Sequence, residues 1–154
     1  MAEEDEPFRF EITPEEEAKF SIDYIPPEEI EDLRVPMTPE QLSELGRRAE
    51  IFASIAEDFP CSLGKELSKN ERDANIMTES TLTYGEVDFV SIGETFYNIK
   101  NNYGGIPPGS FYDLGSGTGK GNLAAAILHP FNESIGIEIL EGLYKTSVEL
   151  NETY

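Results

Sequence analysis

The glycine-rich segment DLGSGTG at residues 113–119 restricts the fold of this chain more than any other feature. Glycine lacks a Cβ, so three glycines at alternate positions allow a tight turn whose backbone can approach a bound molecule closely. The segment ends a β-like run at 110–114 and precedes an apolar helical stretch at 122–128. A strand, a glycine turn and a helix in this order predict the first unit of a parallel α/β sheet.

The chain continues the same alternation after the turn. A second strand is expected at Ser134–Ile139 and a last helix from Leu140 onwards. The β-α-β-α order predicts a Rossmann-like α/β sheet over residues 109–154. Two parallel strands cannot bury both faces of a sheet, so we expect 109–154 to be a truncated form of such a domain.

Helical periodicity dominates residues 37–108, which we expect to form a helical region. Thr38-Pro39-Glu40-Gln41 supplies an N-cap, a first-turn proline and a capping box, and apolar residues follow at helical spacing as far as Phe59. Another amphipathic helix is expected over Glu86–Lys100, and only a weak helix or a loop over 61–80. Residues 1–36 are acidic and contain five prolines, so we expect a loose extension there, with a short helix after Thr13.

The charge of the chain argues against several classes of function. The net charge is −20, from 31 acidic and 11 basic residues, and this field repels nucleic acids and anionic membranes but attracts cationic ligands or basic protein partners. No apolar run approaches the roughly 20 residues of a membrane span, and the acidic start is unlike a signal peptide. Cys61 is the single cysteine, and no Cys/His pairs have metal-ligand spacing. We therefore expect no disulfide, no metal site, and no direct binding of nucleic acid or membrane.

Three ligand motifs compete for the glycine turn. A dinucleotide fingerprint GxGxxG would need glycine at Lys120 or Asn122, and a phosphate loop GxxxxGK[ST] would need glycine at Leu114 and a hydroxyl residue at Gly121. Both motifs fail. The segment fits the pattern strand-D-x-GxGxG-helix, followed by an acid at the end of the next strand, which is typical of class I methyltransferases that use S-adenosylmethionine (SAM).

Glu138 is the acid that this pattern requires. It lies 25 positions after Asp113, at the end of the second expected strand, where open α/β sheets bind their ligands. Its carboxylate could accept hydrogen bonds from both ribose hydroxyls, and Asp113 could accept from the ligand's amino group. The sequence therefore predicts SAM as the cofactor.

From about Thr83 onwards the chain resembles the non-SET histone-lysine methyltransferases of the disruptor of telomeric silencing type. The resemblance rests on Tyr84-Gly85-Glu86 before an amphipathic helix, on residues 113–119, and on Gly136-Ile137-Glu138. It implies a basic protein substrate, such as a histone or nucleosome, and a nuclear protein, with a cytoplasmic location as the alternative.

The resemblance also implies roles for individual residues. In that family the loop at 83–87 covers the methionine end of SAM and helps to shape the lysine channel, so Tyr84 is expected to be catalytic and to contact the cofactor. The other expected cofactor-binding residues are Glu86, Asp113, Gly115, Gly117, Gly119, Lys120 and Glu138. Lys120 stands where the family usually has glutamine, and faces either the SAM carboxylate or solvent.

Three functions stay open on the sequence alone. The first is a SAM-dependent histone-lysine N-methyltransferase, of which this chain would be a fragment without activity in isolation. The second is a class I methyltransferase that acts on another protein or on a small molecule. The third is an inactive acidic module that binds a basic partner.

Overall fold

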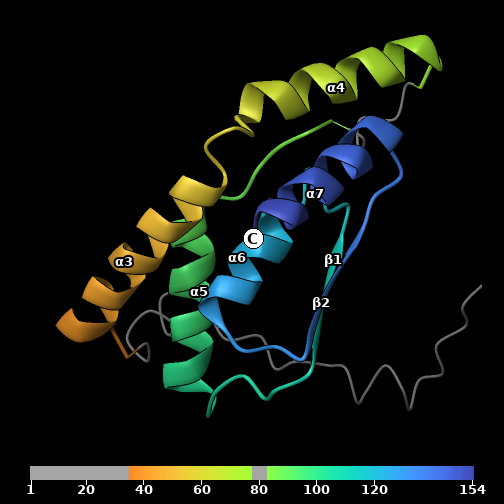
Figure 1. Ribbon diagram of the computed structural model, residues 1–154. Coiled ribbons are helices and arrows are strands. Elements are labelled where there is room, and N and C mark those ends of the chain that lie inside the picture. Colours follow the sequence, from red (N-terminus) through yellow and green to blue (C-terminus); the bar gives the residue numbers. More distant parts are fainter. Residues whose placement is uncertain (1–34, 78–82) are drawn as a thin grey trace, which may run out of the picture. The chain divides into compact units, whose positions relative to one another are not determined.

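The computed structural model describes residues 35–77 and 83–154, which form five helices and a two-stranded parallel sheet (Figure 1). In chain order, the elements are α3 (Pro39–Ile55), α4 (Cys61–Ala74), α5 (Phe89–Asn102), β1 (Ser110–Leu114), α6 (Lys120–Leu128), β2 (Glu133–Ile137) and α7 (Glu141–Thr153). The expected extension at 1–36, with its short helix after Thr13, lies outside the described residues apart from its last two positions. The protein is a mixed α/β protein, mostly helical, with a β-α-β connection, as its sequence predicts.

Helix α3 begins at the predicted capping box. The backbone N–H of Gln41 donates to Oγ1 of Thr38 at 3.2 Å, and the N–H of Thr38 donates to Oε1 of Gln41 at 2.9 Å. The two bonds satisfy backbone donors that a helix start otherwise leaves unpaired. The helix ends at Ile55, short of the predicted end near Pro60.

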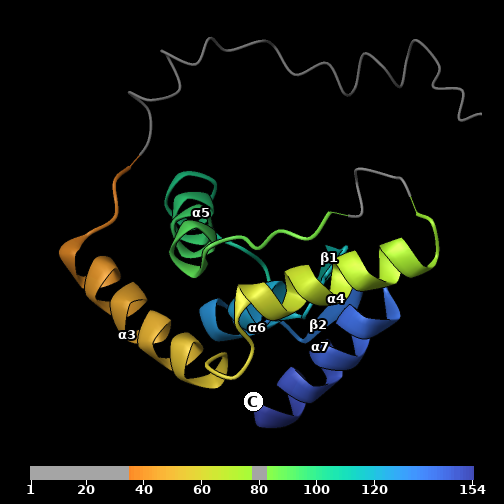
Figure 2. The same cartoon turned by 90° about the horizontal axis from the view of Figure 1, so that it is seen from above.

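Helix α4 forms where the sequence predicts only a weak helix or a loop. Its buried positions are Gly64 and Ser68, and its apolar side chains, Cys61, Leu63 and Leu67, are only partly buried, so its apolar face is small. It lies alongside α7 (Figure 2), and the carboxylate of Glu71 accepts the N–H groups of Glu141 and Gly142 at 2.8 Å each. A carboxylate at a helix N-terminus is favourable, so the bonds from Glu71 to the start of α7 help to hold α4 in place.

Helix α5 begins three residues later than predicted. Asp88 is its N-cap, with Oδ2 accepting the N–H of Ser91 at 3.0 Å, so the first helical residue is Phe89. Glu86 therefore lies in the segment before α5, and its side chain is not part of the helix surface.

The two strands pair in parallel, with Ser110 opposite Glu133 and Leu114 opposite Ile137. Helix α6 packs on one face of the sheet and contacts both strands. The opposite face carries Tyr112 and Leu114 of β1 and Ile137 of β2, which are 59%, 77% and 54% exposed. Because side chains alternate between the faces of a strand, Asp113 and Gly136 lie on the α6 side.

The main core joins α3, α5 and α6. It consists of the buried residues Leu45, Phe89, Ala124 and Leu128. A second cluster of Phe59, Leu123 and Leu150 joins α6 to α7. This core fixes α6, the helix that begins directly after the glycine turn.

Leu45→Ala should lower the free energy of unfolding by about 2–5 kcal/mol, because it leaves a cavity in a site that is 3% exposed. Leu42→Ala on the same helix is the control, since Leu42 is 53% exposed and its truncation should change stability little. Urea denaturation followed by circular dichroism measures both. Equal losses of unfolding free energy in the two variants would show that Leu45 is not a core residue.

Candidate functional site

The candidate site lies where β1 and β2 end, around the loop formed by residues 115–119. Gly115, Gly117 and Gly119 have φ angles of +81°, +55° and +82°, a region that residues with a Cβ rarely adopt. The N–H groups of Gly115 and Ser116 both donate to the carbonyl of Ile137, at 2.8 and 3.0 Å. The loop therefore needs its glycines and is joined to the end of the neighbouring strand.

Glu138, the residue after β2, binds the loop with its side chain. Oε2 accepts the N–H of Gly117 at 2.7 Å, and Oε1 accepts the N–H groups of Ile139 and Leu140 at 2.8 Å each. A carboxylate has about four acceptor positions, and three of them are used here. A ribose bound at Glu138 would have to share or displace one of these donors.

Asp113 presents an unpaired carboxylate beside the loop. Its Oδ2 lies against Gly121 of α6, where a Cβ would overlap it. No described residue donates a hydrogen bond to it. Burial, and then the negative charge of Glu138, raise the pKa of the Asp113 carboxyl above its usual range. Asp113 is only partly buried, so water reaches its oxygens, and an ammonium or hydroxyl donor of a ligand can replace that water.

Tyr84 packs over the loop at Gly117 and Thr118. Its hydroxyl lies 2.8 Å from Oγ1 of Thr118 and donates to Glu86. A Cβ on Gly117 would come within 2.6 Å of the Tyr84 ring. Burial, and then the hydrogen bond to Glu86, raise the pKa of the Tyr84 hydroxyl well above its usual value. Tyr84 is therefore a neutral O–H donor at neutral pH and not a base.

Lys120 joins the Tyr84 segment to the start of α6. Its ammonium donates to both carboxylate oxygens of Glu86 at 2.9 Å each, and the two side chains are only 13% and 20% exposed. Lys120 thus points to Glu86 and not to solvent.

The structure brings together all eight residues that the sequence selects, around a single loop. Sequence reasoning did not select Thr118 or Gly121. Thr118 is 2% exposed and binds Tyr84, but nothing in the sequence indicates this contact. Gly121 carries a usable signal, because a glycine inside the first turn of a helix costs stability and often indicates a close approach.

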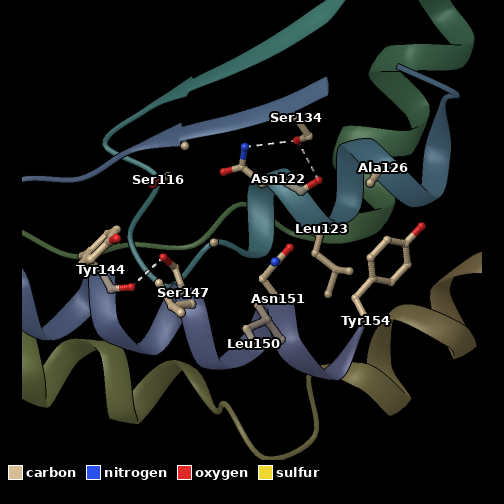
Figure 3. A pocket seen from close by; sticks show the side chains of 13 residues that line it. Ser116, Asn122, Leu123, Ala126, Ser134, Tyr144, Ser147, Leu150, Asn151 and Tyr154 are labelled. Carbon is tan, nitrogen blue, oxygen red and sulfur yellow. Dashed lines mark hydrogen bonds between the residues drawn. The ribbon is translucent and has the colours of Figure 1, made fainter. Parts of the chain in front are cut away.

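Two cavities lie near helix α6, and neither is lined by Glu86, Asp113 or Glu138. The larger, of about 460 Å³, lies between α6, β2 and α7 and reaches the loop at Ser116 and Gly119 (Figure 3). The smaller, of about 340 Å³, lies at the other end of α6 beside His129. The acidic residues of the candidate site therefore lie around residues 115–119 and do not line either cavity.

Within residues 35–77 and 83–154, no three His, Cys, Asp or Glu side chains are grouped so that they could hold a metal ion. Within the same ranges, no helix has the length and apolar content that crossing a bilayer requires.

Comparison with known protein families, with curated proteins and with solved structures finds no significant match to this chain.

Asp113→Asn should raise the free energy of unfolding at pH 7. The folded state raises the pKa of this carboxyl, so folding disfavours its ionised form, and the penalty appears as pH rises through the folded-state pKa. The gain should therefore disappear as pH falls below the pKa of aspartate in the unfolded chain. Denaturant titrations across this pH range measure it.

Glu94→Gln is the matched control, because it removes one negative charge from an exposed position of α5. A similar gain in both variants would mean that overall charge, and not the position of Asp113, sets the effect.

Proposed function

We propose that this chain carries the SAM site of a class I methyltransferase, and that the reaction is N-methylation of a lysine in a basic protein such as a histone. The observation that carries the proposal is the unpaired, partly buried carboxylate of Asp113 beside a loop of three left-handed glycines. This loop lies at the carboxyl ends of two parallel strands, the edge at which α/β sheets bind nucleotides.

The charges of the site fit SAM. Asp113, Glu86 and Glu138 supply three negative charges and Lys120 one positive charge, whereas SAM carries an ammonium, a sulfonium and a carboxylate. Asp113 is the partner for the ammonium, because it alone of the three carboxylates accepts no hydrogen bond among the described residues. Glu138, at the end of the adjacent strand, is the partner for the ribose hydroxyls.

SAM supplies an activated methyl group that a neutral lysine amine can displace in line. The protein's contribution to such a reaction is alignment in a site that excludes water. Tyr84 contributes as a neutral donor that positions groups, because a tyrosine hydroxyl is protonated at neutral pH and the raised pKa of Tyr84 keeps it so. The substrate lysine must therefore lose its proton before or during entry.

Methylation of another protein or of a small molecule would use the same SAM contacts and differ only on the substrate side. The inactive acidic module has its own supporting observation, since Glu138 and Glu86 are already bound by groups of the protein.

Calorimetric titration with SAM separates these proposals. Saturable binding supports either methyltransferase, and its absence supports the acidic module. Binding measurements with histone and non-histone substrates, which need no turnover, then separate the two enzymes.

Gly117→Val should abolish saturable SAM binding. The side chain would meet the Tyr84 ring within 2.6 Å, and valine is strained at a φ of +55°. Gly46→Ala is the control, because a Cβ on Gly46 meets nothing within 4 Å. Circular dichroism verifies that both variants are folded. Wild-type affinity in a folded Gly117→Val protein would mean that the loop has only a structural role.

A further inference from the structure

Gly64 is a glycine in the interior of helix α4 that the conformation of the helix does not require. Glycine lowers the stability of a helix interior relative to alanine. Gly64 is not among the glycines with a positive φ angle, but it is one of the two buried residues of α4. The space around Gly64, and not its backbone conformation, therefore accounts for the glycine.

The ring of Tyr84 fills the space that a side chain at position 64 would need. A Cβ on Gly64 would lie 2.4 Å from both Cε1 and Cζ of Tyr84, and 2.8 Å from its hydroxyl oxygen. A Cβ on Gly117 would lie 2.6 Å from Cε2, on the opposite edge of the same ring. Two glycines therefore lie against opposite edges of the ring, one on α4 and the other in the loop.

The position of the ring decides which groups the Tyr84 hydroxyl reaches. The hydroxyl lies 2.8 Å from Oγ1 of Thr118 and donates to Glu86, which in turn binds Lys120. A side chain at position 64 would overlap the end of the ring that carries this hydroxyl, and would move the hydroxyl relative to both partners. The absence of a side chain at Gly64 therefore sets the hydrogen bonds of Tyr84.

We propose that Gly64 is a positioning residue of the SAM site, and that it acts by leaving room for the Tyr84 ring. This inference rests on the proposed function and adds helix α4 to the site, although no residue of α4 is among those proposed to bind SAM. Glu71 of the same helix accepts the N–H groups of Glu141 and Gly142, so α4 connects Tyr84 to the start of α7.

The first measurement is the SAM affinity of the full chain by calorimetry. Gly64→Ala should weaken SAM binding by about tenfold, as expected when one hydrogen-bonding group is displaced. Gly46→Ala is the matched control, because Gly46 also lies in a helix and a Cβ there meets nothing within 4 Å. The control should keep the wild-type affinity, and circular dichroism verifies that both variants are folded.

The second measurement tests whether Gly64 acts through Tyr84. In urea denaturation, Gly64→Ala should destabilise the wild-type chain, because its Cβ overlaps the ring. In a Tyr84→Leu background the same change should stabilise the protein, because leucine lacks the overlapping atoms and alanine favours a helix over glycine. Opposite signs in the two backgrounds are the signature of a direct contact.

Unchanged SAM affinity in a folded Gly64→Ala protein would overturn this inference and leave the SAM site standing. An equal loss of stability in both backgrounds would also overturn it, because Gly64 would then act through α4 and not through Tyr84. A Gly64→Ala chain that does not fold would show a purely structural role, with the same consequence. Absence of SAM binding by the wild-type chain would overturn the proposed function, and this inference with it.

Discussion

Three backbone N–H groups converge on the carboxylate of Glu138, and the geometry of the whole site depends on them. The bond to Gly117 ties the glycine loop to the end of β2, and the bonds to Ile139 and Leu140 set the direction in which the chain enters α7. Hydrogen bonds to an ionised acceptor are stronger than those between neutral groups. One side chain therefore fixes the loop, the end of the second strand and the last helix relative to one another.

The opposite wall of the site is held differently. The segment from Tyr84 to Glu86 contacts the loop through side chains, with Thr118 and Lys120 as partners. Backbone N–H groups bonded to Ile137 and Glu138 fix the loop half of the site, whereas contacts between side chains hold the other half.

The sequence predicts the loop side of the site better than the Tyr84 side. Alternating glycines, an apolar strand and a capping box are local signals, so β1, α6 and the start of α3 could be read from them. The predicted second strand ends two residues too late, at Ile139 instead of Ile137, because Glu138 turns its carboxylate onto the N–H groups of the residues that follow. Helix α4 and the partner of Lys120 depend on contacts across more than 30 residues, for which no local pattern exists.

The apolar sheet face of Tyr112, Leu114 and Ile137 has a consequence for the behaviour of the protein in solution. At neutral pH a net charge of −20 makes two copies repel one another, which opposes contact between such faces. Near the isoelectric point of about 4.2 this repulsion vanishes, and at about 0.15 M salt it is screened within roughly 8 Å. Self-association of the protein should therefore depend on ionic strength and pH. Both change the repulsion between carboxylates, which opposes contact between the exposed apolar sheet faces.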